Sequence, residues 1–380
     1  MSHRIPFNKP FIAGKEVEYI AQAVTRGNIG ADGHFSVRCA DLLQRQTEAH
    51  KVLMTPSCTA ALEMAALLCD IREGDEVILP SYTFVSSAES FARLGARPVF
   101  VDIRPDTLNL DESLVEAAVS DRTRAIMPVH YAGVACEMDE ILRVARTHGL
   151  RVIEDAAQAV NARYRGRILG GIGDLGAYSF HETKNYSCGE GGALCVNDPA
   201  LAERAEVIRD KGTNRQAFNR GTAARYTWVD RGSSYTLSDL ACAFLSAQLE
   251  HMDAITHRRK EIYLRYLEAL EPLEAEELLR VPRVPAHCES NYHMFYVLLP
   301  DAATRSALIR HLLEHGILSV FHYVPLHLSP MGRSYGYREG QLPVTESLSQ
   351  RILRLPFYFE LEPARQDEVI ETLVAYLRGR

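Results

Sequence analysis

The pattern that most constrains the fold is an alternation of short apolar runs with helical periodicity between Lys51 and Ile153. Strands that are apolar on both faces and alternate with helices predict an α/β fold with a mainly parallel sheet covered by helices on two sides. In such a sheet, ligands bind at the carboxyl ends of the strands. The apolar runs are residues 52–54, 76–79, 98–103, 125–129 and 150–153, and the helical patterns are residues 59–68, 86–94, 113–119 and 138–147.

The flanking segments predict an arm before this region and a second unit after it. Residues 14–26 predict a helix, which a glycine-rich loop, Arg26–Gly33, follows. Residues 238–270 have helical periodicity and predict the exit from the large unit. Because 380 residues exceed what one hydrophobic core usually supports, we expect a large domain over 1–245 and a small α/β domain over 246–380. The patterns assigned to the small domain are residues 294–299, 306–315, 319–323, 346–354 and 363–377.

Charge and motif content exclude several classes of protein. The formal net charge of -7 argues against nonspecific nucleic-acid binding, which needs a basic face. No apolar run approaches membrane-spanning length, and Met1–Phe7 lacks the apolar core of a signal peptide, so we expect a cytoplasmic protein. The chain has no P-loop pattern. Gly171–Gly176 fits GxGxxG but precedes a strand pattern, so the dinucleotide interpretation fails.

The cysteines and histidines predict no metal site. None of the eight cysteines forms a CxxC pair, so we expect mostly free thiols that act as small buried hydrophobic groups. His311 and His315 fit the HxxEH pattern of some zinc proteases. The apolar residues of that helix form a separate stripe, which leaves both histidines on its polar side. We therefore interpret this pattern as a solvated helix face.

Lys184 lies in a turn between two apolar runs, residues 175–180 and 193–196. It is one of only six lysines, and the other basic residues of the chain are arginines. Lysine, unlike arginine, can lose its proton and form an imine with an aldehyde. A GC-rich genome would explain the rarity of lysine equally well. The glycines at 189, 191 and 192 permit close backbone approach around the lysine, although a structural hairpin would also use them. We predict that Lys184 anchors an aldehyde cofactor.

Two strand ends carry groups that suit such a cofactor. Ser57, Cys58 and Thr59 lie where a strand ends and a helix begins, which predicts a phosphate site, with an ordinary helix cap as the alternative. Asp155 follows an apolar strand and would pair with a protonated pyridine nitrogen. Its alternatives are a helix cap or a surface acid. Strand alternation points Glu154 to the opposite side.

Aromatic and basic residues predict further contacts. Phe84 follows a strand end and would stack on a cofactor ring, with Tyr82 as the other candidate and core packing as the alternative. Arg215 lies in a basic loop that would meet a substrate diphosphate, unless the loop is only solvated. His322 and Tyr323 would close over a sugar, and core packing is again the alternative.

Taken together, four segments resemble the DegT/DnrJ/EryC1/StrS family of sugar aminotransferases, and within it the group that makes dTDP-4-amino-4,6-dideoxyhexoses. The resemblance extends from Ile5 to Pro356. The four segments are residues 55–60, 80–86, 128–139 and 179–185. The resemblance implies the fold-type I architecture of enzymes that use pyridoxal 5'-phosphate (PLP).

The resemblance also assigns roles to individual residues. It implies PLP on Lys184, Asp155 at the pyridine nitrogen, Gln158 near the ring hydroxyl and Phe84 stacked on the ring. The phosphate would contact Ser57, Cys58, Thr59 and Ser179. Family members are homodimers whose active sites borrow residues from the neighbour. Many have Asn-Tyr-Arg where this chain has Ser234-Tyr235-Thr236, so Ser234 or Asn185 would replace that asparagine. The substrate side is assigned to Ile29, His130, Arg215, His322 and Tyr323.

The implied reaction is a transamination from L-glutamate to C4 of a dTDP-4-keto-6-deoxyhexose, with Lys184 moving the proton. Alternatives are an aminotransferase for a nucleotide-linked 4-keto-pentose and a PLP sugar dehydratase. Dehydratases of the family have histidine in place of the lysine, which Lys184 argues against. A noncatalytic nucleotide-sugar binder and a nicotinamide enzyme are more distant alternatives. The configuration at C4 and the pathway, surface polysaccharide or natural product, stay open.

Overall fold

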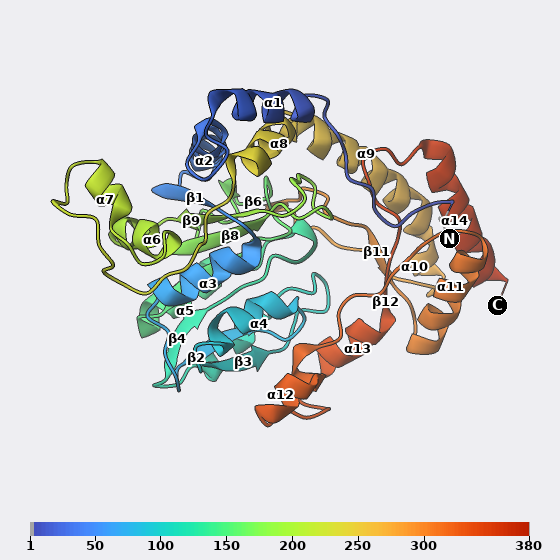
Figure 1. Ribbon diagram of the computed structural model, residues 1–380. Coiled ribbons are helices and arrows are strands. Elements are labelled where there is room, and N and C mark those ends of the chain that lie inside the picture. Colours follow the sequence, from blue (N-terminus) through green and yellow to red (C-terminus); the bar gives the residue numbers. More distant parts are fainter. Residues whose placement is uncertain (1–3, 380) are drawn as a thin grey trace.

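A seven-stranded sheet forms the centre of the computed structural model, which describes residues 4–379 (Figure 1). The strand order is β1-β9-β8-β5-β4-β2-β3. Neighbouring strands are parallel except that β9 runs antiparallel to both β1 and β8. The prediction of a mainly parallel sheet is therefore confirmed. The strands are β1 (Lys51–Thr55), β2 (Glu76–Pro80), β3 (Arg97–Val101), β4 (Thr123–Ile126), β5 (Arg151–Asp155), β8 (Leu175–Ser179) and β9 (Gly192–Val196).

Helices cover both faces of this sheet because side chains alternate across each strand. In β1, Val52 and Met54 join the core under one group of helices, whereas Leu53 joins the core on the opposite face. The first group is α1 (Glu16–Arg26), α2 (His34–Thr47), α5 (Met138–His148) and α8 (Asp239–Glu250). The second group is α3 (Cys58–Leu68), α4 (Val85–Ala92) and α6 (Ala202–Arg209). Each face of the sheet is therefore covered by an apolar core, as the apolar strands predict.

The structure differs from the predictions at several stretches. Helix α2 was not predicted, although Phe35, Cys39 and Leu43 are spaced four residues apart and are buried. Residues 113–119 form two short 3₁₀ turns instead of a helix. The periodicity over 238–270 belongs to two helices, α8 and α9 (Met252–Leu270), which meet at His251.

The C-terminal part has its own apolar core. Helices α9, α11 (Ala302–Glu314) and α14 (Pro363–Arg378) pack with a two-stranded sheet of β11 (Tyr296–Leu298) and β12 (Ile352–Arg354). Residues 319–323, predicted as part of this unit, form no strand and make one bridge, Val320 to Arg354. Ile5 also belongs to this core and bridges to Ile317, so the start of the described chain crosses to the C-terminal part. We keep a division near residue 245 as a proposal.

The remaining β-strands and α-helices are short. They are β6 (Arg163–Tyr164), β7 (Arg167–Ile168), β10 (Cys288–Glu289), α7 (Arg215–Asn219), α10 (Pro272–Ala275), α12 (Pro330–Ser334) and α13 (Pro343–Arg351). Within residues 4–379, no helix combines the length and the apolar character needed to cross a membrane.

Candidate active site

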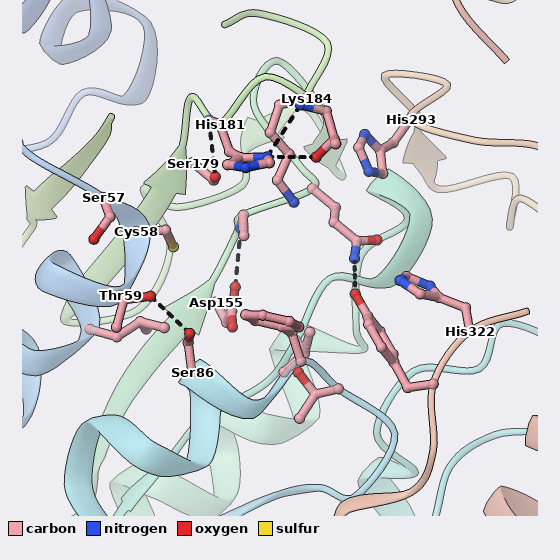
Figure 2. Close-up of a pocket in the computed structure, with 18 of the residues that line it drawn as sticks. Ser57, Cys58, Thr59, Ser86, Asp155, Ser179, His181, Lys184, His293 and His322 are labelled. Atoms are coloured by element: carbon pink, nitrogen blue, oxygen red, sulfur yellow. Dashed lines mark hydrogen bonds between the residues drawn. The ribbon is translucent and has the colours of Figure 1, made fainter. Parts of the chain in front are cut away.

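A cavity of about 650 Å³ lies where the parallel strands end and the C-terminal part meets them. Strands β1, β2, β5 and β8 point the same way, so the residues that follow them meet at one edge of the sheet. From this edge come Thr59, Phe84, Asp155, Ser179 and Lys184. The opposite wall is formed by Phe7, His293, His322, Tyr323 and Arg354. Figure 2 shows several of these side chains converging on the same space.

Lys184 lies in the loop that joins β8 to β9, and its amide N–H donates to the carbonyl of His181 at 2.9 Å. Ser179 and Gly192, which end this loop, are paired across the two strands. Gly192 passes so close to the start of α3 that an added Cβ would lie 2.4 Å from the carbonyl carbon of Ser57. Only glycine permits this approach. The lysine loop and the start of α3 are therefore held against each other.

The electrostatic surroundings of Lys184 favour its neutral amine. Burial lowers the pKa of its ammonium below the ordinary value, and the charge of Arg354 lowers that pKa further, whereas Cys58 and Asp155 act in the opposite direction. An amine with a lowered pKa loses its proton at a lower pH and becomes nucleophilic there.

We therefore predict that Lys184 reacts with an amine-directed reagent at a lower pH than Lys15. The charge of Glu250 raises the pKa of Lys15, which makes it an internal reference. Peptide mass spectrometry of cofactor-free protein, labelled across a pH series and scaled to each lysine's own plateau, measures both midpoints. Equal midpoints would contradict the expected order.

Hydroxyl groups and free amides gather at the start of α3. The Oγ of Ser57 accepts from the N–H of Ala60 at 3.0 Å, so its capping role is real. The first N–H groups of a helix have no partner within the helix, and the helix dipole favours an anion there. The hydroxyls of Thr59 and Ser86 lie 2.8 Å apart beside this start, and both residues line the cavity. The cap is thus compatible with the predicted phosphate site.

Asp155 is 6% exposed and lines the cavity. Its Oδ2 accepts from the hydroxyl of Ser87 at 2.6 Å, and its Oδ1 accepts from the amide of Ala157 at 3.1 Å. It is therefore not the surface acid that the sequence left open. Gln158 is fixed nearby, because its Oε1 accepts from the Ala132 amide at 2.7 Å and its Nε2 donates to the Tyr323 hydroxyl at 3.1 Å.

Phe84 and Tyr82 differ sharply in exposure. The ring of Tyr82 is 1% exposed and belongs to the core, whereas Phe84 is 57% exposed and lines the cavity. Core packing is therefore the correct interpretation for Tyr82 but not for Phe84. Stacking of Phe84 on a ligand ring stays a prediction.

The assignment of His130 to the substrate side is wrong for this chain, because the side chain is fully buried and absent from the cavity wall. Its Nδ1 accepts from the Cys136 amide, so its Nε2 carries the proton that it donates to Glu154 at 3.0 Å. Glu154, on the opposite face of β5 from Asp155, also accepts from the amides of Gly170, Ile172 and Gly173. This carboxylate therefore fixes the loop before β8, which is the GxGxxG stretch.

We predict that Glu154→Gln destabilises the fold by about 3 kcal/mol, because an amide NH2 cannot accept and leaves buried donors unpaired. The midpoint and slope of urea unfolding measure this change. Glu140→Gln is the control, since Glu140 is a half-buried helix residue on the surface that pairs with Arg143. Equal unfolding midpoints for the two variants would disprove the anchoring role.

Four other predicted site residues do not line the cavity. Asn185 is buried behind it: its Nδ2 donates to the Asn291 carbonyl, and its Oδ1 contacts Nδ1 of His293. Direct contact of Asn185 with a cofactor phosphate is therefore corrected to support of His293. Ile29, Arg215 and Ser234 are exposed on loops and a short helix away from the cavity. Their contacts with a ligand stay predictions that require a second subunit.

The sequence did not predict every residue of the cavity wall, and three of those missed are charged or aromatic. His293, Arg354 and Phe7 reach the site from the C-terminal part and from the N-terminal arm. No local motif marks them, because each follows or precedes an ordinary apolar run. The bridge from Ile5 to Ile317 and the contact from the Phe357 amide to the Phe7 carbonyl explain why Phe7 reaches the cavity.

Comparison with known proteins yields consistent matches. The model of the DegT/DnrJ/EryC1/StrS aminotransferase family matches residues 10–374. The spore coat polysaccharide biosynthesis protein SpsC of Bacillus subtilis (strain 168) is 36% identical over 387 residues, covering 100% of this chain and 98% of SpsC. The aminotransferase TlmJ from Streptoalloteichus hindustanus has a TM-score of 0.90 and 32% identity, with 99% of each chain covered. The PLP form of Spr1654 from Streptococcus pneumoniae has a TM-score of 0.90 and 25% identity, with 99% of each chain covered.

Proposed function

The chain belongs to the DegT/DnrJ/EryC1/StrS aminotransferase family, and from this membership we propose that it transfers the amino group of L-glutamate to C4 of a dTDP-4-keto-6-deoxyhexose. The product would be a dTDP-4-amino-4,6-dideoxyhexose. The cofactor is PLP, which family relatives carry in PLP and PMP forms.

The residues of the cavity fit this cofactor. The close approach of Gly192 to Ser57 places the start of α3 beside the lysine loop. A helix end suited to an anion and a lysine therefore face the same cavity. Lys184 would hold the aldehyde, Asp155 the pyridine nitrogen, and Thr59, Ser57, Cys58 and Ser179 the phosphate. When bound, PLP supplies an aldehyde for covalent attachment and a ring that withdraws electrons.

The observation that supports the proposal most is that Lys184 and Asp155 line the same cavity at the carboxyl edge of the sheet. The two roles need different groups: an acceptor for the ring nitrogen and an amine that can lose its proton. Both oxygens of Asp155 accept hydrogen bonds, from the Ser87 hydroxyl and the Ala157 amide, and this acceptor arrangement suits a protonated ring nitrogen. The lowered pKa of Lys184 suits an amine that takes a proton from one carbon and returns it to another.

A second subunit is part of the proposal. Ile29, Arg215 and Ser234 lie on a surface formed by neighbouring segments of the chain. Asp32 accepts hydrogen bonds from Arg209 at 2.5 Å and from Gln216 at 2.9 Å. Ser234 forms a β-bridge with Asp210. We propose that this surface faces the cavity of the partner in a homodimer, where Arg215 would meet the substrate diphosphate. A cytoplasmic location is proposed with it, since nucleotide sugars are cytoplasmic metabolites.

The test is the structure of the product. Purified protein loaded with PLP is incubated with L-glutamate and dTDP-4-keto-6-deoxyglucose, and the product is examined by NMR. We expect an amine on C4, and the proton couplings at C4 then distinguish the galacto from the gluco configuration. A product lacking a hydroxyl would support the dehydratase alternative. Turnover of a 4-keto-pentose alone would shift the substrate class.

A further inference from the structure

Arg354 is a cationic side chain of the cavity wall, and none of the described residues provides it with an anionic partner. It lies at the end of β12 and lines the cavity with Lys184. Its guanidinium carbon lies 4.8 Å from the centre of the Phe7 ring, so the arm supports one face of the guanidinium. Its Nε is buried and has no hydrogen-bond partner within residues 4–379, and no carboxylate in that range forms an ion pair with it. A buried donor left unpaired is costly unless a ligand satisfies it.

The acids of the cavity wall are engaged elsewhere. Asp155 accepts from Ser87 and Ala157, and Glu190 is exposed with His181 as its neighbour at 3.7 Å. The charge of Arg354 is felt by the residues around the lysine, because it contributes to the lowered pKa of Lys184, His293 and His322. The guanidinium therefore acts on the reacting end of the cavity.

The chemistry of the two substrates indicates which of their anionic groups Arg354 could bind. In an amino-acid donor, the carboxylate is attached to the carbon that bears the reacting amine. In a nucleotide sugar reacting at C4, the diphosphate is attached to C1, on the other side of the ring. An anion that must lie beside Lys184 is therefore the carboxylate of the donor. A planar guanidinium is suited to it, since it can donate two parallel hydrogen bonds to one carboxylate.

We propose that Arg354 binds the α-carboxylate of the amino-acid donor and thereby selects an amino acid over a neutral amine. The proposal rests on the aminotransferase function given above and adds a residue that determines its donor class. Phe7 would keep the guanidinium in place between reactions. The structure provides a matched control in Arg305, whose Nε is likewise unpaired and whose guanidinium carbon lies 5.4 Å from the centre of the Phe321 ring, outside the cavity wall.

The first experiment measures binding without turnover. Glutarate has no amine and cannot react, and glutaramide is its uncharged counterpart. Calorimetry on the PLP-loaded protein should give weaker glutarate binding in Arg354→Gln by about 10- to 100-fold, with glutaramide unchanged. The glutarate affinity of Arg354→Lys should lie between these two, because lysine keeps the charge but loses the bidentate hydrogen-bond geometry. Arg305→Gln should bind glutarate like the unmodified protein.

The second experiment separates the two half-reactions. Stopped-flow absorbance follows the PLP-loaded protein with L-glutamate, and then the amine-loaded protein with the keto sugar. We expect Arg354→Gln to need a higher glutamate concentration and to keep its response to the keto sugar. Loss confined to the keto-sugar half-reaction would overturn the proposal in favour of a substrate anion. Unchanged glutarate binding in Arg354→Gln would also overturn it.

These outcomes are distinct from failure of the proposed function. If the unmodified protein binds glutarate through Arg354 yet aminates no keto sugar, the carboxylate site stands and the proposed acceptor is wrong. If it aminates the sugar and Arg354→Gln does so at the same glutamate concentration, the acceptor stands and the role of Arg354 is wrong.

Discussion

Lys184→Ala is expected to abolish the visible absorbance of the bound cofactor and to lower the transamination rate by about 10⁴-fold or more. The change would remove both the amine proposed to attach the cofactor and the group proposed to move the proton, and loss of a positioned acid and base alone costs up to about this factor. The measurements are the absorbance spectrum of protein purified with excess PLP and the rate of glutamate-dependent product formation. Thermal unfolding of the cofactor-free protein should be little changed, because the half-buried ammonium is itself disfavoured by burial.

The control for this result is Lys260→Ala. Lys260 lies on the exposed side of α9 and outside the cavity. It should retain both absorbance and rate. If Lys184→Ala keeps the absorbance band and full turnover, Lys184 is not the anchor, and the assignment of the cavity as the active site fails with it.

Asp155→Asn is expected to lower the rate by about 100- to 1000-fold while leaving the cofactor attached. The carboxylate would stabilise the protonated ring nitrogen, and removing one preorganised electrostatic partner costs about this much. Asparagine keeps the size of the side chain and one oxygen that accepts from Ser87, so the fold should persist. Single-turnover absorbance with L-glutamate measures the effect on the chemical step, and the cofactor content measures attachment.

Ser87→Ala provides the graded comparison. It leaves the carboxylate in place but removes the hydroxyl that donates to Oδ2 at 2.6 Å. We expect a smaller loss than for Asp155→Asn, because only the orientation of the acid changes. A rate in Asp155→Asn equal to that of the unmodified protein would mean that the acid has a structural role alone.

Local sequence patterns were sufficient to predict the site residues at the edge of the sheet. They were not sufficient to predict the residues on the opposite wall of the cavity. Asp155 ends a parallel strand, Lys184, Thr59 and Phe84 each follow one, and parallel strands must end at one edge. Their meeting was therefore implied by the strand pattern. Arg354 and His293 come from the C-terminal part, and their distance from Lys184 depends on how two cores pack. No periodicity within one segment contains that information.

His130 and Asn185 show a second limit. Both are polar residues in segments that resemble the family, and both are buried outside the cavity wall, where His130 contacts Glu154 and Asn185 contacts His293. A buried histidine and a ligand-binding histidine have the same sequence signature, since only packing decides which of them water can reach. Helix α2 was missed for another reason. Its burial against α8 is a long-range contact, and its polar composition hides the apolar spacing.

The position of β9 has a consequence for how the protein is made. This strand inserts between β1, near the beginning of the chain, and β8, which precedes it directly. A nascent chain that ends before Gly192 lacks the strand that closes the lysine loop and presses it against the start of α3. The two halves of the proposed cofactor site thus come together only after long-range strand pairing, which is a slow kind of folding event. Cofactor binding therefore selects completed molecules and adds its own binding energy to their stability.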